Sequence, residues 1–227
     1  MAMKKDRKIP ILDVMGPVMV GPSSSHTAGT ARLGRVAYEI LAEDPVELRF
    51  YLHPPLAKTF RGHGSDFALA GGGLGMSVDD PRIPESIRIA EQAGVAVEFE
   101  EEDLGDVHPN TVRISAKGKT REVEVIGSSI GGAAIEVFNI NGFTTRFKGD
   151  SPTLLLFYQD LPGMIARVTD IIAREGINIA SLSCSRRSRG QEAFMQIDVD
   201  SPLSDQALQT IRAIESVSEA KYLDRIP

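Results

Sequence analysis

The chain has 227 residues, of which 42% are hydrophobic, and a formal net charge of −6. This length accommodates one large domain or two small ones, and the apolar fraction is enough for a buried core. The acidic balance leaves no basic footprint for nucleic acid. Basic residues open the chain at 4–8, but no long apolar run follows, so we expect neither a secretory signal nor a membrane span. The single cysteine, Cys184, fits a reducing cytosol, and we therefore expect a cytoplasmic protein.

Residues 10–148 alternate helical and strand patterns. A first helix is expected from Ser25 or His26 to Glu43, and Gly29 and Gly34 within it indicate close packing against another backbone. A second helix is expected over 84–93, and strands are expected at 48–52, from 95 onward, and at 112–116, 121–126 and 135–140. The mixture predicts an α+β or α/β sheet with helices packed on it.

Turn-forming residues cluster at 139–142 and 148–152, which predicts a boundary between an N-terminal domain, 10–148, and a C-terminal domain, 152–227. The second domain reads strand, helix, strand, strand, helix, strand. Its helices are expected to begin at Pro162-Gly163 and at Ser204 or Asp205, and its strands to cover 153–158, 177–185, 193–199 and 217–226. This βαββαβ order is that of ferredoxin-like folds.

The first candidate site is the serine-rich loop Gly21-Pro22-Ser23-Ser24-Ser25-His26-Thr27. Hydroxyls and backbone N–H groups ahead of a helix can hold an anion. Gly16 and Gly21 have the spacing of a P-loop, but Pro22-Ser23 replaces its Lys-Ser/Thr pair, which excludes nucleotide binding. On the residues alone, a plain serine N-cap followed by a surface histidine is the favoured alternative.

Three further segments combine polar side chains with special backbone residues. In Arg61-Gly62-His63-Gly64-Ser65-Asp66 the glycines let the backbone approach a ligand, and an exposed histidine in a helix interruption is an equal alternative. In Val107-His108-Pro109-Asn110-Thr111, Pro109 shapes a loop from which His108 and Asn110 project, unless the segment only starts a strand. The segment from Ser128 to Ile135 can cradle a carboxylate or form a β-bulge, and the bulge is favoured.

The string from Met15 to Gly29 closely resembles the start of the β chain of bacterial iron–sulfur-dependent L-serine dehydratases. The family motif His-Pro-Asn-Thr is intact at 108–111, and Gly-His-Gly-Thr-Asp occurs with Ser65 in place of threonine. Segment 161–168, followed by 176–179, resembles an ACT domain, a small regulatory module that usually binds amino acids and pairs side by side. The resemblance implies an α+β protein with an N-terminal α/β substrate-binding-like domain, similar to one in some phosphoglycerate dehydrogenases, followed by a ferredoxin-like ACT domain.

The resemblance also implies an activity, the β-elimination of L-serine to pyruvate and ammonia. It assigns catalysis to four residues and substrate binding to four others. The catalytic residues are His26, Thr27, His108 and Asn110, and the substrate-binding residues are Ser24, Ser25, His63 and Ser65. The residue that takes the α-proton stays open, and no lysine has a recognisable Schiff-base context for pyridoxal phosphate.

The cofactor that the family implies is a 4Fe–4S cluster, whose Lewis-acidic iron would take the leaving hydroxyl. Such a cluster needs three or four thiolates, and Cys184 supplies one. We therefore expect no metal on this chain and place the cluster on a separate cysteine-rich α chain.

For the ACT-like part, the expected effector-binding residues are Leu161, Gly163 and Asn178, because a helix N-terminus attracts a carboxylate. Serine-inhibited phosphoglycerate dehydrogenases carry His and Asn side chains just before the Pro-Gly, where this chain has Tyr158 and Asp160. A serine site and a structural homodimerisation role therefore both stay open.

Two other functions compete with the dehydratase. One is a non-catalytic amino-acid sensor that acts through the ACT domain. The other is a mononuclear metal hydrolase, but the spacing of its candidate ligands matches no common metal motif. These ligands would be His26, His53, His63 and His108.

Overall fold

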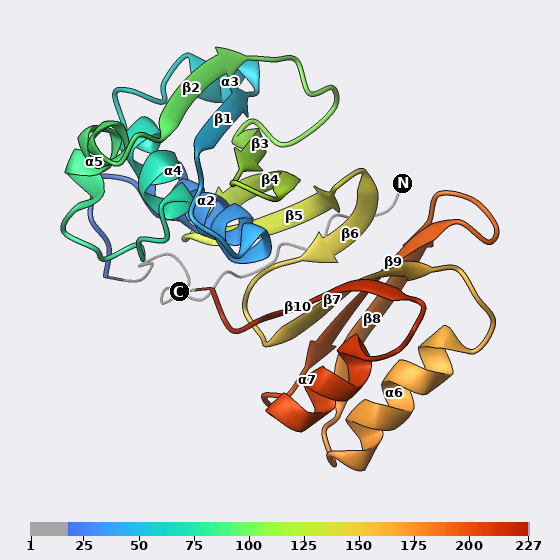
Figure 1. Cartoon of the computed structure of the whole chain (residues 1–227). Helices are drawn as coiled ribbons and strands as arrows, with labels where there is room; N and C mark the ends of the chain where they lie inside the picture. The colour runs from blue at the N-terminus through green and yellow to red at the C-terminus, as the bar shows by residue number, and fades with distance from the viewer. Residues whose placement is uncertain (1–17, 227) are drawn as a thin grey trace, which may run out of the picture.

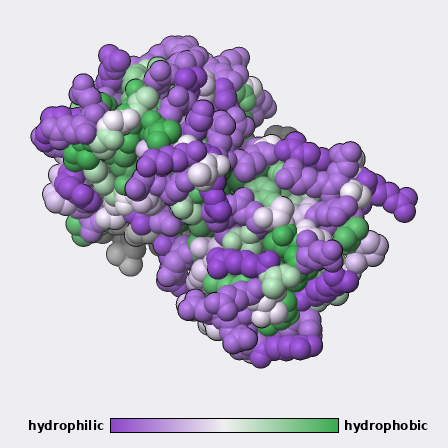
Figure 2. All heavy atoms as spheres, viewed as in Figure 1, coloured by the Kyte–Doolittle hydropathy of each residue, from purple (hydrophilic) through white to green (hydrophobic). Residues whose placement is uncertain are grey.

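The computed structural model describes residues 18–226 and arranges them as two lobes, each built on its own sheet (Figure 1). The first residues of the predicted N-terminal domain, from 10, and positions 15–17 of the family-like string lie outside the described residues. The space-filling view shows the lobes in contact, with hydrophilic side chains over most of both (Figure 2).

The first lobe holds a six-stranded sheet in the order β2-β1-β3-β4-β5-β6. Only β1 and β2 pair in parallel, while the neighbours from β1 to β6 are antiparallel. Buried and half-buried residues alternate along β1, as the sequence pattern predicts for a strand with one face on a core. The strands are β1 (Glu47–Leu52), β2 (Ala96–Glu101), β3 (Thr111–Lys117), β4 (Glu122–Gly131), β5 (Ala134–Ile140) and β6 (Phe143–Phe147).

Helix α2 (Gly29–Leu41) packs on the β3–β5 part of this sheet, and α4 (Ser65–Gly73) packs on α2. A Cβ atom on Gly34 would collide with the Leu69 carbonyl oxygen, and one on Gly72 with that of Ala31. The predicted close backbone approach is therefore confirmed at Gly34. The remaining helices of the lobe are the π-helical turn η1 (Ser24–Ala28), α3 (Pro54–Ala57), the 3₁₀ turn η2 (Ile83–Glu85) and α5 (Ser86–Gln92).

The second lobe has an antiparallel sheet in the order β10-β7-β9-β8. Helices α6 and α7 cover the outer face of this sheet (Figure 1), which confirms the predicted ferredoxin-like order. Ser204 caps α7 by accepting a hydrogen bond of 3.1 Å from the backbone N–H of Ala207. The elements are β7 (Thr153–Gln159), α6 (Met164–Arg174), β8 (Ile179–Arg186), β9 (Glu192–Val199), α7 (Asp205–Arg212) and β10 (Val217–Leu223).

The inner face of the second sheet packs against the first lobe. The rings of Phe143, Phe157 and Phe194 lie 5.0–5.9 Å apart and belong to one continuous core with the first sheet. Gln196, almost fully buried, exchanges hydrogen bonds with the backbone of Arg146. The first lobe contributes Phe143 and Arg146 to this contact from β6, a strand that was not predicted and lies between the two clusters of turn-forming residues.

Candidate functional site

The serine-rich loop ends in the π-helical turn η1. Ser23 is the N-cap, and its hydroxyl accepts a hydrogen bond of 3.1 Å from the His26 backbone N–H. The Ser25 hydroxyl lies 3.1 Å from His26 Nδ1. The serine N-cap of the simpler alternative is thus present, but the histidine is half buried instead of lying free on the surface. Single π-helical turns of this kind are frequent at functional sites.

The second motif lies directly on the first. The imidazole rings of His26 and His63 stack with their centroids 4.7 Å apart. Thr27 donates its hydroxyl to the His63 carbonyl oxygen at 2.9 Å, and Ser65 donates its hydroxyl to the His26 carbonyl oxygen at 2.6 Å. These two hydroxyls therefore hold the two motifs together, and both residues are buried, so their protons are used within the protein.

Burial lowers the pKa of His26 below its ordinary value of 6.5, and the charge of the neighbouring His63 lowers that pKa further. At neutral pH His26 is consequently an uncharged imidazole with one acceptor nitrogen. Such a group can hold or accept a proton, which is the property that general acid–base chemistry requires.

The third motif is a tight loop ahead of β3. The backbone N–H of Asn110 donates to His108 Nδ1 at 3.1 Å, and the Thr111 hydroxyl donates to the His108 carbonyl oxygen at 2.6 Å. A neutral His108 must therefore carry its proton on Nε2. The His108 side chain is exposed, so a hydrogen-bond donor points out of a fixed loop.

The fourth motif joins the third to the first. The Ser129 backbone N–H donates to the Asn110 carbonyl oxygen at 3.0 Å, and the register of β4 against β5 shifts between Ser129 and Gly131. The predicted β-bulge is thus confirmed. The Ser129 side chain is buried against Gly29, where any Cβ atom would overlap the Ser129 hydroxyl. We call segments 23–29, 63–66, 108–111 and 128–129, linked by these contacts, the four-motif cluster.

Two residues of the cluster have features that the sequence did not reveal. One carboxylate oxygen of Asp66 and the Ser129 hydroxyl are buried without a hydrogen-bond partner among residues 18–226. Burial raises the pKa of the Asp66 carboxyl above its ordinary value. Both residues belong to motifs that the sequence analysis singled out, but only the tertiary packing shows that their polar atoms have no hydrogen-bond partner.

The four histidines do not form a metal site. The His53 backbone N–H donates to the Thr111 carbonyl oxygen at 3.1 Å, but its side chain is bound elsewhere: Nδ1 accepts a hydrogen bond of 3.3 Å from the Leu104 backbone N–H. Within the described part of the chain, no three His, Cys, Asp or Glu side chains converge to hold a metal ion. Cys184 is an exposed residue of β8, in the second lobe, and a lone thiol does not fit a 4Fe–4S cluster.

The candidate effector residues are divided between two hollows. Leu161 and Gly163 line a cavity of about 490 Å³ at the start of α6, where Gly163 has a left-handed backbone and offers no side-chain cap. Asn178 lines a different cavity of about 460 Å³ and donates its side-chain amide to Asp200 at 2.8 Å. A single chain therefore does not bring the three residues into one pocket.

None of the helices over residues 18–226 is long and apolar enough to cross a membrane.

Known proteins resemble both lobes. The ACT domain family model matches residues 153–216, which confirms the predicted ACT domain. The chain is 41% identical over 214 residues to the L-serine dehydratase beta chain of Peptoniphilus asaccharolyticus, covering 93% of this chain and 96% of the other. It is 40% identical over 207 residues to the probable L-serine dehydratase beta chain of Bacillus subtilis, covering 91% and 94%. A D-3-phosphoglycerate dehydrogenase of Bacillus subtilis is 25% identical over 150 residues, covering 63% of this chain and 29% of that protein. The two beta-chain relatives span nearly the whole sequence, and the chain belongs to the family of L-serine dehydratase beta chains.

Proposed function

We propose that this chain is the β subunit of a two-chain lyase that converts L-serine to pyruvate and ammonia. The observation that carries the proposal is the four-motif cluster. Its segments are spread over more than 100 positions of the sequence, yet hydrogen bonds and packing link them into one surface. The family membership makes L-serine the first substrate to test.

The elimination needs a proton removed from the α-carbon and a proton or hydrogen bond supplied to the leaving hydroxyl. Neutral His26 can hold a proton, while His108 presents its Nε2–H from a fixed loop. The Asn110 side chain can orient the substrate carboxylate by hydrogen bonds, and Ser24, Ser25 and His63 are the further substrate-binding residues of the proposal. We leave the group that abstracts the α-proton unassigned.

The single thiol of this chain does not fit the cluster that the family resemblance implies, so we assign no step to iron here. In the proposal, a cysteine-rich α chain in the cytoplasm carries the 4Fe–4S cofactor. The four-motif cluster of the present chain covers that cofactor. Pairing of two copies through the ACT domain is part of the same proposal. It would let Leu161 and Gly163 of one copy meet Asn178 of the next.

The test is His108→Ala in the assembled two-chain complex. Losing a placed proton donor costs on the order of 10²- to 10⁴-fold in turnover, while assembly and iron content should remain unchanged. His53→Gln is the matched control, because the His53 side chain accepts from the Leu104 N–H and a glutamine oxygen can still do so, while the backbone bond to the Thr111 carbonyl oxygen is unchanged. Near-normal turnover in His108→Ala would show that His108 has no role in the active site.

A further inference from the structure

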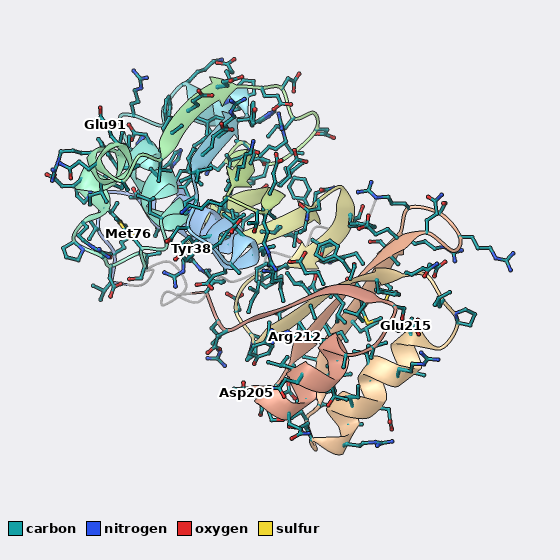
Figure 3. All side chains as sticks on the ribbon, in the orientation of Figure 1. Tyr38, Met76, Glu91, Asp205, Arg212 and Glu215 are labelled. Carbon is teal, nitrogen blue, oxygen red and sulfur yellow. The ribbon has the colours of Figure 1, made fainter. Side chains whose placement is uncertain are left out.

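A cavity of about 440 Å³ lies at the junction of the two lobes. Glu39 from α2 and Arg121 from the β3–β4 turn line it on the first lobe, and Arg212 from the end of α7 and Lys221 from β10 line it on the second. Figure 3 labels Arg212, which reaches β10 by donating its Nε–H to the Ala220 carbonyl oxygen at 3.3 Å. The volume of the cavity falls in the range of small-ligand sites.

The positive charges of this cavity are only partly balanced. Arg121 and Lys221 both pair with the same oxygen of Glu219, at 3.0 and 3.3 Å. Glu39 is already paired with Arg35 at 2.6 Å. Among residues 18–226, no carboxylate lies within ion-pair distance of the Arg212 guanidinium. Of the carboxylates that line the cavity, only Glu219 is free to balance the three cations. Glu43, outside the lining, also acts on Arg121 and accepts its backbone N–H at 2.8 Å, so an excess of about one positive charge remains.

Lys221 shows that this excess is costly. The residue is only 8% exposed, so its side chain is largely enclosed at the wall of the cavity. Burial lowers the pKa of Lys221, and the nearby charges of Arg121 and Arg212 lower that pKa further, against the opposing effect of Glu219. A bound anion would neutralise the excess and replace the lost hydration of the ammonium.

We propose that the junction cavity binds a small phosphate-bearing anion, held by Arg121, Arg212 and Lys221. A phosphate group carries about −1.5 to −2 charges at neutral pH, which is enough to offset the excess positive charge of the cavity. Because the three cations come from both lobes, the ligand would fasten the ACT lobe to the lobe that holds the four-motif cluster. The proposal does not depend on the dehydratase function and concerns a place separate from Leu161, Gly163 and Asn178.

The probe is inorganic phosphate, added to the full chain and measured by calorimetry and by thermal unfolding, with sodium chloride at equal ionic strength as the reference. We expect saturable binding and a rise in Tm that chloride does not reproduce. Arg212→Gln should weaken phosphate binding at least about tenfold, the loss expected for one charge-assisted hydrogen bond. Arg174→Gln is the matched control, because Arg174 occupies the equivalent last turn of the other ACT helix, α6.

Lys221→Met provides a second variant with the same expected loss of binding and an added gain in Tm without phosphate, because it removes a poorly balanced buried charge. Phosphate that acts no more strongly than chloride would overturn the proposal. Equal binding by the wild type and Arg212→Gln would also overturn it. Saturable binding of malonate without binding of phosphate would contradict the assignment to phosphate in favour of a dicarboxylate.

Discussion

His26 is kept neutral by burial and by the facing ring of His63, and this has a consequence for pH dependence. The folded state binds a proton at His26 less readily than the unfolded chain, whose histidines titrate near 6.5. The unfolded state therefore takes up more protons as the pH falls. The contribution of His26 to the free energy of unfolding is fully present above pH 6.5. It is lost progressively as the pH falls from 6.5 towards the lower pKa of the folded state.

The His63→Gln substitution tests this arrangement directly. It removes the neighbouring charge and opens the stacked ring to water, and both changes should raise the pKa of His26 towards 6.5. An NMR titration of the His26 ring proton measures the shift, with His53→Gln as a variant that should leave it unchanged. A His26 pKa that stays the same or falls in His63→Gln would contradict the stacked pair.

At this scale the sequence predicted the histidines but not their surroundings. The motif strings place His26 and His63 in glycine- and serine-rich loops, yet nothing in the spacing of 37 positions says that the rings stack. The unpaired polar atoms of Asp66 and Ser129 were equally hidden, because an orphaned oxygen is a property of three-dimensional packing.

Helix α2 meets strand β4 at the contact between Gly29 and Ser129, which connects the serine-rich loop to the His108 loop. We predict that Gly29→Ala destabilises the chain by about 1–3 kcal/mol, the usual cost of forcing an extra carbon into a packed core. The added Cβ would collide with both the Cβ and the hydroxyl of Ser129. Denaturant unfolding measures the loss.

Gly62→Ala is the control, because a Cβ there would meet only the Thr59 carbonyl oxygen at an ordinary 3.6 Å. The double variant Gly29→Ala/Ser129→Gly should recover part of the stability, since Ser129 then has neither a Cβ nor a hydroxyl. Equal stability of Gly29→Ala and Gly62→Ala would contradict the tight contact.

Most strands were predictable because apolar and polar residues alternate in them, as in β1 and β3. Strand β6 was missed because it is only five residues long and lies between two turns. Asn141 and Gly142 precede it and Gly149 follows it, and these three residues indicate turns. Helix α4 was missed because it ends in the glycine run 71–73, a poor helix former in isolation. Gly72 is required by the neighbouring helix, since a side chain there would collide with the backbone of α2, and a Cβ on Gly73 would collide with the Leu48 side chain of β1.

Arg32, a buried residue of α2, links the first lobe to the segment between the lobes and to the C-terminal end of the described chain. Its guanidinium donates to the Ile226 carbonyl oxygen at 3.0 Å and to the Ala133 carbonyl oxygen, beside the bulge, at 2.9 Å. It also reaches the segment between the lobes, through the Gly149 carbonyl oxygen at 3.3 Å and the Asp150 carboxylate at 3.0 Å. The sequence could not assign this role, because the partners lie more than 100 positions away.

We predict that Arg32→Met lowers the free energy of unfolding by at least about 1–3 kcal/mol, the cost of leaving one buried acceptor unpaired. Asp150→Asn should cost about 0–1 kcal/mol, because the Asp150 side chain is 62% exposed and the backbone acceptors remain. Denaturant unfolding of both variants separates the two contributions. A smaller loss for Arg32→Met than for Asp150→Asn would contradict the central place of the buried guanidinium.

The proposed two-chain lyase is tested by an anaerobic co-purification of this chain with a cysteine-rich partner, followed by an assay of pyruvate formation from L-serine. We predict an iron-containing complex that forms pyruvate only when both chains are present. A chain that recruits no such partner, or a partner that is fully active without this chain, would contradict it.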